Sequence, residues 1–348
     1  MAPIRAALIG TGRIAQEHLA CLRQLPGVEL AGVCDRYGSL AEMTADRFGV
    51  GAWFSDHRAM LEQVKPDVVH ITTPPASHVP LTLDALDAGS HVFVEKPITT
   101  SYEEFRTLRA KAEEKRRHLV EDHNYVYNAS VRKIVELVKS GEFGEVRHVD
   151  VFFCVGIFGE GSPFADPNLP HGALKLKGGA VADFLPHLAS LAHAFVGAHT
   201  SARSLWKEEA GHFREFRAMV NAERGTASVG LSTQAQPNAF WLRVYGTKMH
   251  AEADLLEPRL TITPLRSCHA GLMPLVNGMH EAWDVGKSAL RGFKGRLAAD
   301  PMANEGIWEL ISQTYRALQS GAEPPVSLDD VDEVNRLVED FTREELQL

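Results

Sequence analysis

Two side chains that can move a proton, Asp183 and His187, are four residues apart in an apolar stretch, GGAVADFLPHLASLAHAF, residues 178–195. At this spacing on a helix both side chains lie on one face. An imidazole titrates near neutral pH and acts as a general base, while a carboxylate can orient the ring and stabilise its charged form. The spacing therefore predicts an acid–base pair. A helix cap or a structural hydrogen bond is the alternative that this stretch alone leaves open.

Pro186 predicts where the helix begins. Proline is tolerated in the first turn of a helix but not deep inside it, so we expect the regular helix to begin close to Asp183. With Asp183 as the N-cap, the N3 residue is Pro186, which has no N–H to donate to the capping carboxylate. The carboxylate is then available to His187 or to a ligand. The preceding pair Gly178 and Gly179 suits close approach of the backbone to a bulky group.

A second candidate site is the sequence GTGRIA, which follows a strand-like run and precedes a helix-like run. Gly10 permits a tight turn, Gly12 lets the backbone approach a pyrophosphate, and Ala15 lets the helix pack on the sheet. The free N–H groups of that helix then face the phosphates. Asp35 ends the next strand, where an acidic residue accepts hydrogen bonds from an adenosine ribose. The pattern predicts a dinucleotide site; a flavodoxin-like domain without a dinucleotide is the alternative.

The cofactor preference depends on Asp35 and Arg36. A carboxylate at the ribose disfavours the 2′-phosphate of NADP, so Asp35 predicts NAD. Arg36 lies beside it and is able to bind such a phosphate, which keeps NADP possible.

Lys96 closes the strand-like run HVFVEKP. Ligands of open α/β sheets bind beyond the carboxyl ends of the strands, so Lys96 is a candidate for holding a substrate oxygen. The loop TTPPASH, residues 72–78, ends another strand at the same edge. Its Ser77 and His78 either begin the next helix or touch the cofactor.

The elements that must position these residues alternate along the first third of the chain. Apolar strands alternate with amphipathic helices, which indicates a doubly wound parallel sheet of the Rossmann type. After about residue 145, strand-like runs are separated by turn residues, which predicts an α+β domain with a large, mostly antiparallel open sheet. We expect domains at 1–123 and 124–348. The second sheet should leave one partly apolar face to be covered, which favours a homodimer or homotetramer formed through it.

Composition excludes several classes of protein. The chain has 348 residues, 45% hydrophobic and 23% charged, and a net charge of −9. This charge argues against nucleic-acid binding. We find no leader segment and no apolar run of the ~20 residues that span a bilayer, so we expect a cytoplasmic protein with no membrane partner. The four cysteines lack metal or redox spacing, which predicts free thiols and no metal site: Cys21, Cys34, Cys154 and Cys268.

These motifs, in their order and spacing, resemble the Gfo/Idh/MocA family, named for glucose–fructose oxidoreductase, inositol dehydrogenase and a rhizopine-catabolism protein. The similarity covers nearly the whole chain and also includes GGAVADFLPH and YGTKMHAEADL. It implies that Lys96, Asp183 and His187 converge on a substrate beside the nicotinamide. The implied activity is NAD(P)-dependent hydride transfer to or from a secondary alcohol or carbonyl of a sugar or polyol. A glycosidase that uses transient oxidation and a ligand-sensing regulator are the alternatives.

The predicted site has a cofactor part and a substrate part. At the cofactor we expect Gly10, Gly12, Arg13, Ile14, Asp35, Arg36, Thr73, Pro74, His78, Glu95, Lys96 and Asn124. At the substrate we expect Lys96, His171, Lys175, Lys177, Asp183 and His187, although the histidine and lysines at 171–177 are also typical of solvated loop charges.

Two features depart from the family pattern. Val126 stands where many members carry arginine, so one polar contact to substrate is missing. An amphipathic segment at 267–302 is interpreted as a subunit contact or a pocket cover, with a membrane-surface helix as the alternative.

Overall fold

The structure is a computed structural model that describes residues 2–159, 164, 172–257, 259–266, 272–297, 305–343 and 346–347. It divides into two compact units. The first comprises Met1–Asn124 and Ile307–Arg336, and the second comprises Tyr125–Gly306 and Leu337–Leu348. The first division lies one residue beyond the expected boundary. Residues 307–336, expected in the second domain, group with the first unit.

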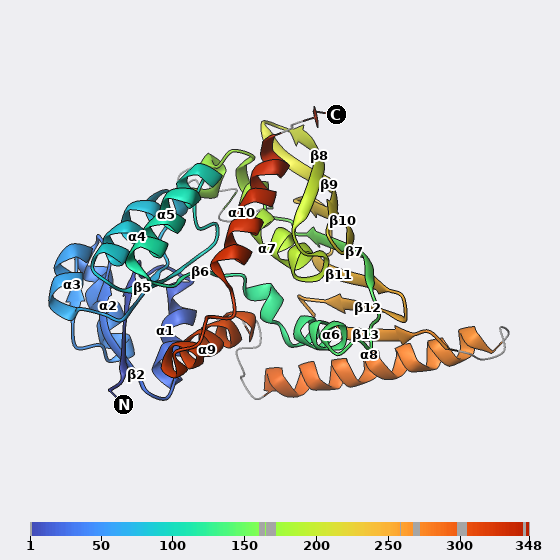
Figure 1. Cartoon of the computed structure of the whole chain (residues 1–348), viewed down its shortest axis with the longest axis horizontal. Helices are drawn as coiled ribbons and strands as arrows, with labels where there is room; N and C mark the ends of the chain where they lie inside the picture. The colour runs from blue at the N-terminus through green and yellow to red at the C-terminus, as the bar shows by residue number, and fades with distance from the viewer. Residues whose placement is uncertain are drawn as a thin grey trace. The chain divides into compact units, whose positions relative to one another are not determined.

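The first unit is built on a six-stranded parallel sheet with the order β3-β2-β1-β4-β5-β6. This confirms the predicted doubly wound sheet, whose order reverses direction between β1 and β4. Figure 1 labels β2, β5 and β6 of this sheet and the helices α1 to α5 of the same unit. The core strands are mostly apolar because both faces are covered by helices. The strands are β1 (Ile4–Ile9), β2 (Val28–Cys34), β3 (Trp53–Phe54), β4 (Val68–Ile71), β5 (His91–Val94) and β6 (Leu119–Glu121).

The helices of this unit connect its strands and complete its core. Three have side-chain caps: Asp56 accepts from the backbone at the start of α3, Ser101 does so for α5, and Ser327 does so for α10. Tyr315 of α9 is fully buried and reaches the sheet core through His70. The helices are α1 (Ala15–Gln24), α2 (Gly38–Phe48), α3 (His57–Val64), α4 (His78–Asp87), α5 (Tyr102–Lys115), α9 (Glu305–Ser320) and the first part of α10 (Leu328–Arg343).

The second unit is built on an eight-stranded sheet with the order β13-β12-β11-β7-β10-β9-β8-β14. Most neighbours are antiparallel, as predicted; β7 with β10 and β8 with β14 are parallel. The strands are β7 (Val146–Cys154), β8 (His199–Glu209), β9 (His212–Ala222), β10 (Gly225–Ser232), β11 (Ala239–Gly246), β12 (Met249–Asp254), β13 (Arg259–Pro264) and β14 (Leu346–Gln347).

The two faces of this sheet differ. One face is apolar and packs on α7 (Gly179–Val196), where Phe153 of β7 contacts Phe184 of the helix. The other face carries exposed or half-exposed side chains around a hollow of about 600 Å³, including Arg203, Met219 and Trp241. Among the described helices α7 is long and apolar enough to cross a membrane by composition, but 72% of it is buried inside the unit, as in a core helix.

The start of α7 corrects the sequence prediction. The helix begins at Gly179 with Gly178 as its N-cap, so Asp183 lies in the helix and is not its cap, and Pro186 lies inside the helix. Gly178 has φ +89°, and a Cβ there would lie 2.9 Å from the ring of buried Trp206. The helix begins before Asp183 because the contact of Gly178 with Trp206 of β8 fixes its N-terminus. The position of Pro186 gives no information about this contact.

The segment after β13 forms the long helix α8 (Met273–Leu297), and α6 (Ala129–Lys139) follows the start of the unit. The inner side of α8 contacts β13, with Ser288 Oγ accepting from the backbone N–H of Leu260 at 3.5 Å. Leu275, Met279 and Trp283 are exposed on the helix. The ends of the predicted segment, at 267–271 and 298–302, lie outside the described residues.

Candidate functional site

The glycine turn between β1 and α1 has the geometry that its motif predicts. Gly10 has φ +94°, and a Cβ there would lie 2.6 Å from Thr73 Cγ2, so the turn needs glycine. Thr72 Oγ1 donates to Gly10 O at 2.6 Å and ties the turn to the end of β4. Apart from its own chain neighbours, no described residue has an atom within 4 Å of the position that a Cβ would take at Gly12. A backbone that is open on this side leaves room for a pyrophosphate.

The start of α1 is also open to an anion. Its N-cap is Ile14, and no side chain of the described residues caps it. The N–H groups of Gln16 and Glu17 donate to Arg13 O and Ile14 O, and the helix dipole favours negative charge at this end. Arg13, just before, is exposed.

Asp35 follows β2 and is held by three hydrogen bonds. Its Oδ2 accepts from the backbone N–H and the hydroxyl of Thr11, each at 2.9 Å, and its Oδ1 accepts from Tyr37 N at 3.0 Å. These bonds fix the carboxylate beside the glycine turn. Arg36 donates to the Tyr37 hydroxyl at 3.0 Å and stacks over its ring. The sequence did not indicate that Asp35 also shapes the turn.

His78 begins α4, as expected, and its ring is fully buried. Nε2 lies 2.7 Å from Thr73 O and Nδ1 lies 2.9 Å from Pro97 O, so the ring links the loop after β4 to the loop after β5. Burial lowers the pKa of His78, while the two carbonyl groups oppose this effect. A role at the cofactor would therefore be indirect, through the positions of Thr73 and of the loop that holds Lys96. Pro74 is exposed at the same loop.

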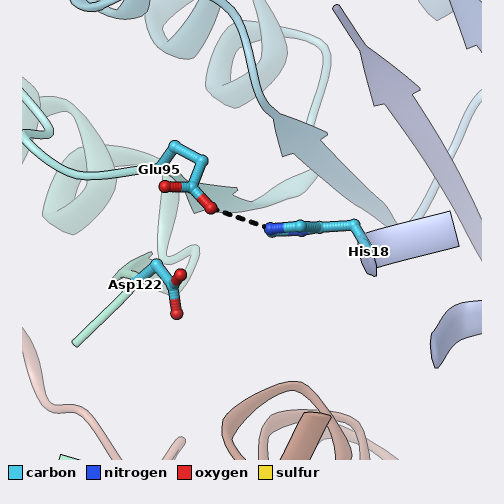
Figure 2. A group of neighbouring side chains, drawn as sticks. All are labelled: His18, Glu95 and Asp122. Carbon is cyan, nitrogen blue, oxygen red and sulfur yellow. Dashed lines mark hydrogen bonds and ion pairs between the residues drawn. The ribbon is translucent and has the colours of Figure 1, made fainter. Parts of the chain in front are cut away.

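Figure 2 shows a buried group at the ends of β5 and β6, formed by Glu95, Asp122 and His18. His18 Nε2 lies 3.0 Å from Glu95 Oε1, and Asp122 hydrogen-bonds Glu95. One ligand atom from each residue lies within 4.8 Å of the others. Lys96 follows Glu95 directly, and its charge acts on both carboxyl groups.

The two carboxyl groups differ in their protonation. Burial raises the pKa of Asp122 well above its usual range, and the neighbouring Glu95 raises it further. Burial also acts to raise the pKa of Glu95, but the hydrogen bond and charge of His18, together with the charge of Lys96, hold it below its usual value. The opposite directions of the two pKa shifts make Asp122 the more readily protonated member of the pair.

His18 and Asp122 are residues that the sequence reasoning missed. Asp122 is the residue after β6, the neighbour of the strand that carries Glu95, and this position was the available signal. His18 lies one turn into α1, and no motif singled it out. Its Nδ1 lies 2.9 Å from His70 Nδ1, and His70 Nε2 lies 3.0 Å from the Tyr315 hydroxyl.

Asn124 ends the first unit and offers a further polar group. Its Oδ1 is buried and has no hydrogen-bond partner among the described residues. A buried unsatisfied oxygen is costly and needs an explanation. A ligand that donates a hydrogen bond, such as a carboxamide or hydroxyl group, would satisfy it.

In the second unit, α7 carries Asp183 and His187. His187 is 8% exposed, and its ring packs edge-on against Tyr125 with centroids 4.8 Å apart. Tyr125 packs in turn on Phe240 of β11 at 4.7 Å. Tyr125 was not identified from the sequence, although it stands between Asn124 and Val126, both of which were considered. It also lines a cavity of about 810 Å³ whose wall includes Lys287 of α8.

The three basic substrate candidates before α7 have different outcomes. His171 lies outside the described residues. Lys175 ends a short 3-10 helix, Gly172–Lys175, and only the backbone of Lys175 is described. Lys177 is exposed, and its Nζ donates to Thr342 O at 2.9 Å in the last turn of α10. This bond gives Lys177 a structural role in the second unit.

Comparison with known protein families gives two matches. Residues 4–123 match the model of the oxidoreductase family with an NAD-binding Rossmann fold, GFO_IDH_MocA, and residues 131–252 match the C-terminal domain model of the same family. The first match agrees with the predicted nicotinamide cofactor. The second ends before α8.

Individual relatives cover parts of the chain. A glycosyl hydrolase family 109 protein of Akkermansia muciniphila is 32% identical over 42% of this chain and 33% of its own length. The D-glucoside 3-dehydrogenase of Escherichia coli K12 is 34% identical over 41% of each chain. This chain thus matches less than half the length of these two curated relatives. The WlbA dehydrogenase of Bordetella pertussis, solved with NADH and UDP-GlcNAcA, has the same fold: TM-score 0.77, 17% identity, 98% of this chain and 95% of that one.

Proposed function

Because the chain belongs to the Gfo/Idh/MocA family of oxidoreductases, we propose that it transfers a hydride between NAD and a secondary alcohol or carbonyl group. The substrate class is a sugar, a polyol or a sugar derivative, in line with the dehydrogenases that it resembles. The observation that carries this proposal is the pairing of an open glycine turn with Lys96 at the end of β5. Both lie at the carboxyl edge of one parallel sheet, where such sheets bind ligands.

The residues of the first unit fit a dinucleotide. The turn at Gly10 and Gly12, with the N-terminus of α1, would hold the pyrophosphate, and Asp35 would accept from the adenosine ribose. Asn124 Oδ1 offers an acceptor for the nicotinamide end. Asp35 favours NAD over NADP because a 2′-phosphate would meet its carboxylate. When bound, the nicotinamide supplies the hydride chemistry.

The side chains have separate roles in the proposed reaction. His187 takes the hydroxyl proton of the substrate during oxidation and returns it during reduction. Asp183 orients and stabilises the imidazolium. Lys96 holds the substrate oxygen and stabilises negative charge that develops on it. Tyr125 packs on the ring of His187 and limits its orientation.

An NAD-dependent glycosidase is the second candidate, favoured by the relative from Akkermansia muciniphila. The two functions differ in the fate of the cofactor. A dehydrogenase accumulates NADH in proportion to the oxidised substrate, whereas a glycosidase regenerates NAD⁺ and releases the leaving group.

The test is a panel of polyols, aldoses, sugar acids, nucleotide sugars and aryl glycosides offered with NAD⁺. We expect stoichiometric NADH absorbance with at least one free sugar or polyol, and the reverse reaction with its ketone. Release of the aryl group without NADH accumulation would assign the glycosidase. Tight binding of a sugar with neither product would assign a regulator.

We further propose that the protein is cytoplasmic and forms a homodimer or homotetramer through the exposed face of the second sheet. Supporting this, Met219 and Trp241 are apolar groups on that face, beside Arg217 and Arg243. The cysteines Cys21, Cys34 and Cys154 are buried free thiols. Light scattering on the purified chain and on Met219→Asp tests the assembly, and a single-chain mass for the unmodified protein would contradict it.

We assign α8 to the cover of the cavity beside Tyr125.

A further inference from the structure

The carboxyl groups of Glu95 and Asp122 lie side by side because of the strand register. Val94 of β5 is paired with Glu121 of β6, so the residues that follow leave the sheet together. Asp122 N donates to Val94 O at 2.9 Å, and Glu95 N donates to Ile71 O at 3.0 Å, which holds both backbones. Asp122 is 1% exposed and Glu95 is 7% exposed. Water therefore contributes little to the stability of their charges.

A chain of hydrogen bonds behind Glu95 sets which partner donates to it. With Glu95 ionised and accepting from His18 Nε2, every bond is satisfied when the Tyr315 hydroxyl donates to His70 Nε2 and His70 Nδ1 donates to His18 Nδ1. Burial lowers the pKa of His70 well below its usual value, so His70 stays neutral. Burial acts to raise the pKa of Glu95, but the hydrogen bond from His18 and the charge of Lys96 hold it below its usual value, so Glu95 is the ionised acceptor.

Among the described residues, the titratable groups around Asp122 are Glu95, Lys96, Glu121 and His18, and a ring nitrogen of His18 lies within 4.8 Å of the carboxyl group. Glu95 lies on one side, Lys96 acts on both carboxyl groups, and Glu121 precedes Asp122 on its own strand. The carboxylate of Glu121 is fully engaged, because it accepts from Ile98 N, His123 Nε2 and Asn335 Nδ2. The Oδ1 of Asp122 has no partner among the described residues. A protonated Asp122 that donates to Glu95 through its other oxygen is the state that fits these contacts.

The position of the pair in the fold relates it to the cofactor. The carboxyl edge of the sheet has two halves around the reversal between β1 and β4. Asp35 is on the β2 half, which we assign to the adenosine. Glu95, Lys96 and Asp122 are on the β5–β6 half, which we assign to the nicotinamide.

We propose that Glu95 and Asp122 hold one shared proton beside Lys96, and that binding of the oxidised cofactor releases this proton to solvent while binding of the reduced cofactor retains it. This inference depends on the proposed function. The oxidised nicotinamide ring carries one positive charge that the reduced ring lacks. In a buried site this charge favours ionisation of Asp122: its O–H bond breaks, the buffer takes the proton, and the new carboxylate balances the ring. Asp122 is thus a positioning residue for charge and takes no part in the hydride step.

The test measures proton release by the full chain. Calorimetric titration with NAD⁺, in buffers that differ in ionisation enthalpy, should show release approaching one proton per site, and titration with NADH should show little. Within the titration range the affinity for NAD⁺ should rise up to about tenfold per pH unit, because one proton is linked to binding. The affinity for NADH should stay flat.

Asp122→Asn keeps the shape of the side chain and carries no exchangeable carboxyl proton, so we expect its NAD⁺ affinity to lose the pH slope. Glu95→Gln removes the partner and should also abolish the release. Asp46→Asn makes the same chemical change at an exposed position of α2 and should keep both the release and the slope. An unchanged slope in both Asp122→Asn and Glu95→Gln would overturn the proposal.

A second measurement needs no cofactor. The pKa of Asp122 is raised in the folded state, so above the usual pKa of aspartate the folded chain binds one proton more than the unfolded chain. The stability of the unmodified protein must then fall with rising pH relative to Asp122→Asn, until Asp122 ionises in the folded state. Parallel melting curves would overturn the shared proton. Micromolar binding of Zn²⁺ alone, lost in Asp122→Asn, would overturn it in favour of a metal site.

These measurements separate the two levels of inference. Failure to bind either NAD⁺ or NADH, with the predicted pH dependence of melting intact, contradicts the proposed function and the cofactor linkage but leaves the shared proton. Binding of both cofactors without proton release contradicts the linkage alone.

Discussion

The candidate residues of the first unit and those of the second unit are held by different means. In the first unit, hydrogen bonds from backbone and side-chain groups fix the carboxylates: Asp35 and Glu121 each accept three. In the second unit, ring packing surrounds His187, which contacts Tyr125, and Tyr125 contacts Phe240. Directional bonds make the residues of the first unit sensitive to the loss of a charge or acceptor. Ring packing makes the environment of His187 sensitive to side-chain volume.

The strongest test of this contrast is His187→Asn. The variant keeps a polar side chain of similar size but removes the group that titrates, so we expect turnover to fall by about 10²–10⁴. The affinity for NADH, measured by its fluorescence, should stay within about twofold because the glycine turn belongs to the other unit. His193→Asn, on the same helix, is the matched control. Full turnover by His187→Asn would remove this residue from the mechanism.

Glycine substitutions compare the two units directly. Gly10→Ala and Gly178→Ala each place a Cβ within 3.0 Å of a neighbour at positive φ, so we expect each to lower the free energy of unfolding by about 1–3 kcal/mol. Gly12→Ala meets no described atom and should keep its melting temperature while binding NADH more weakly. Gly179→Ala, also without a close neighbour but at φ +59°, should cost only about 1 kcal/mol. Equal melting temperatures for Gly10→Ala and Gly12→Ala would contradict the assigned roles.

A smaller effect is expected at the adenosine end. Asp35→Ser removes the carboxylate that disfavours a 2′-phosphate, while Arg36 remains beside it. We therefore expect the ratio of NADPH affinity to NADH affinity to rise by about tenfold, the size of effect expected from losing one charge repulsion near the protein surface. Asp35→Asn keeps the shape and controls for the lost bonds to Thr11 and Tyr37. If both variants keep the original ratio, Asp35 does not select the cofactor.

The same contrast explains how much the sequence predicted. The carboxyl ends of parallel strands share one edge by architecture, so the turn at Gly10, the acid at Asp35 and the lysine at Lys96 could be placed from local motifs. The start of α7 could not, because the Gly178–Trp206 contact joins residues far apart in the sequence. His18 and Asp122 were missed for a related reason. Their importance comes from a pairing of β5 and β6 with α1 that no local pattern encodes.

The assignment of residues 307–336 to the first unit has a consequence for synthesis of the chain. The Tyr315 hydroxyl is the last partner in the row of hydrogen bonds that runs from Glu95 through His18 to His70. This row lacks that partner while the ribosome is still translating the second unit. Residues 1–124 alone would emerge with part of their interior unfilled and would wait for nearly two hundred further residues. The cofactor-binding half of this protein is therefore finished late in translation, although its motifs are among the first residues made.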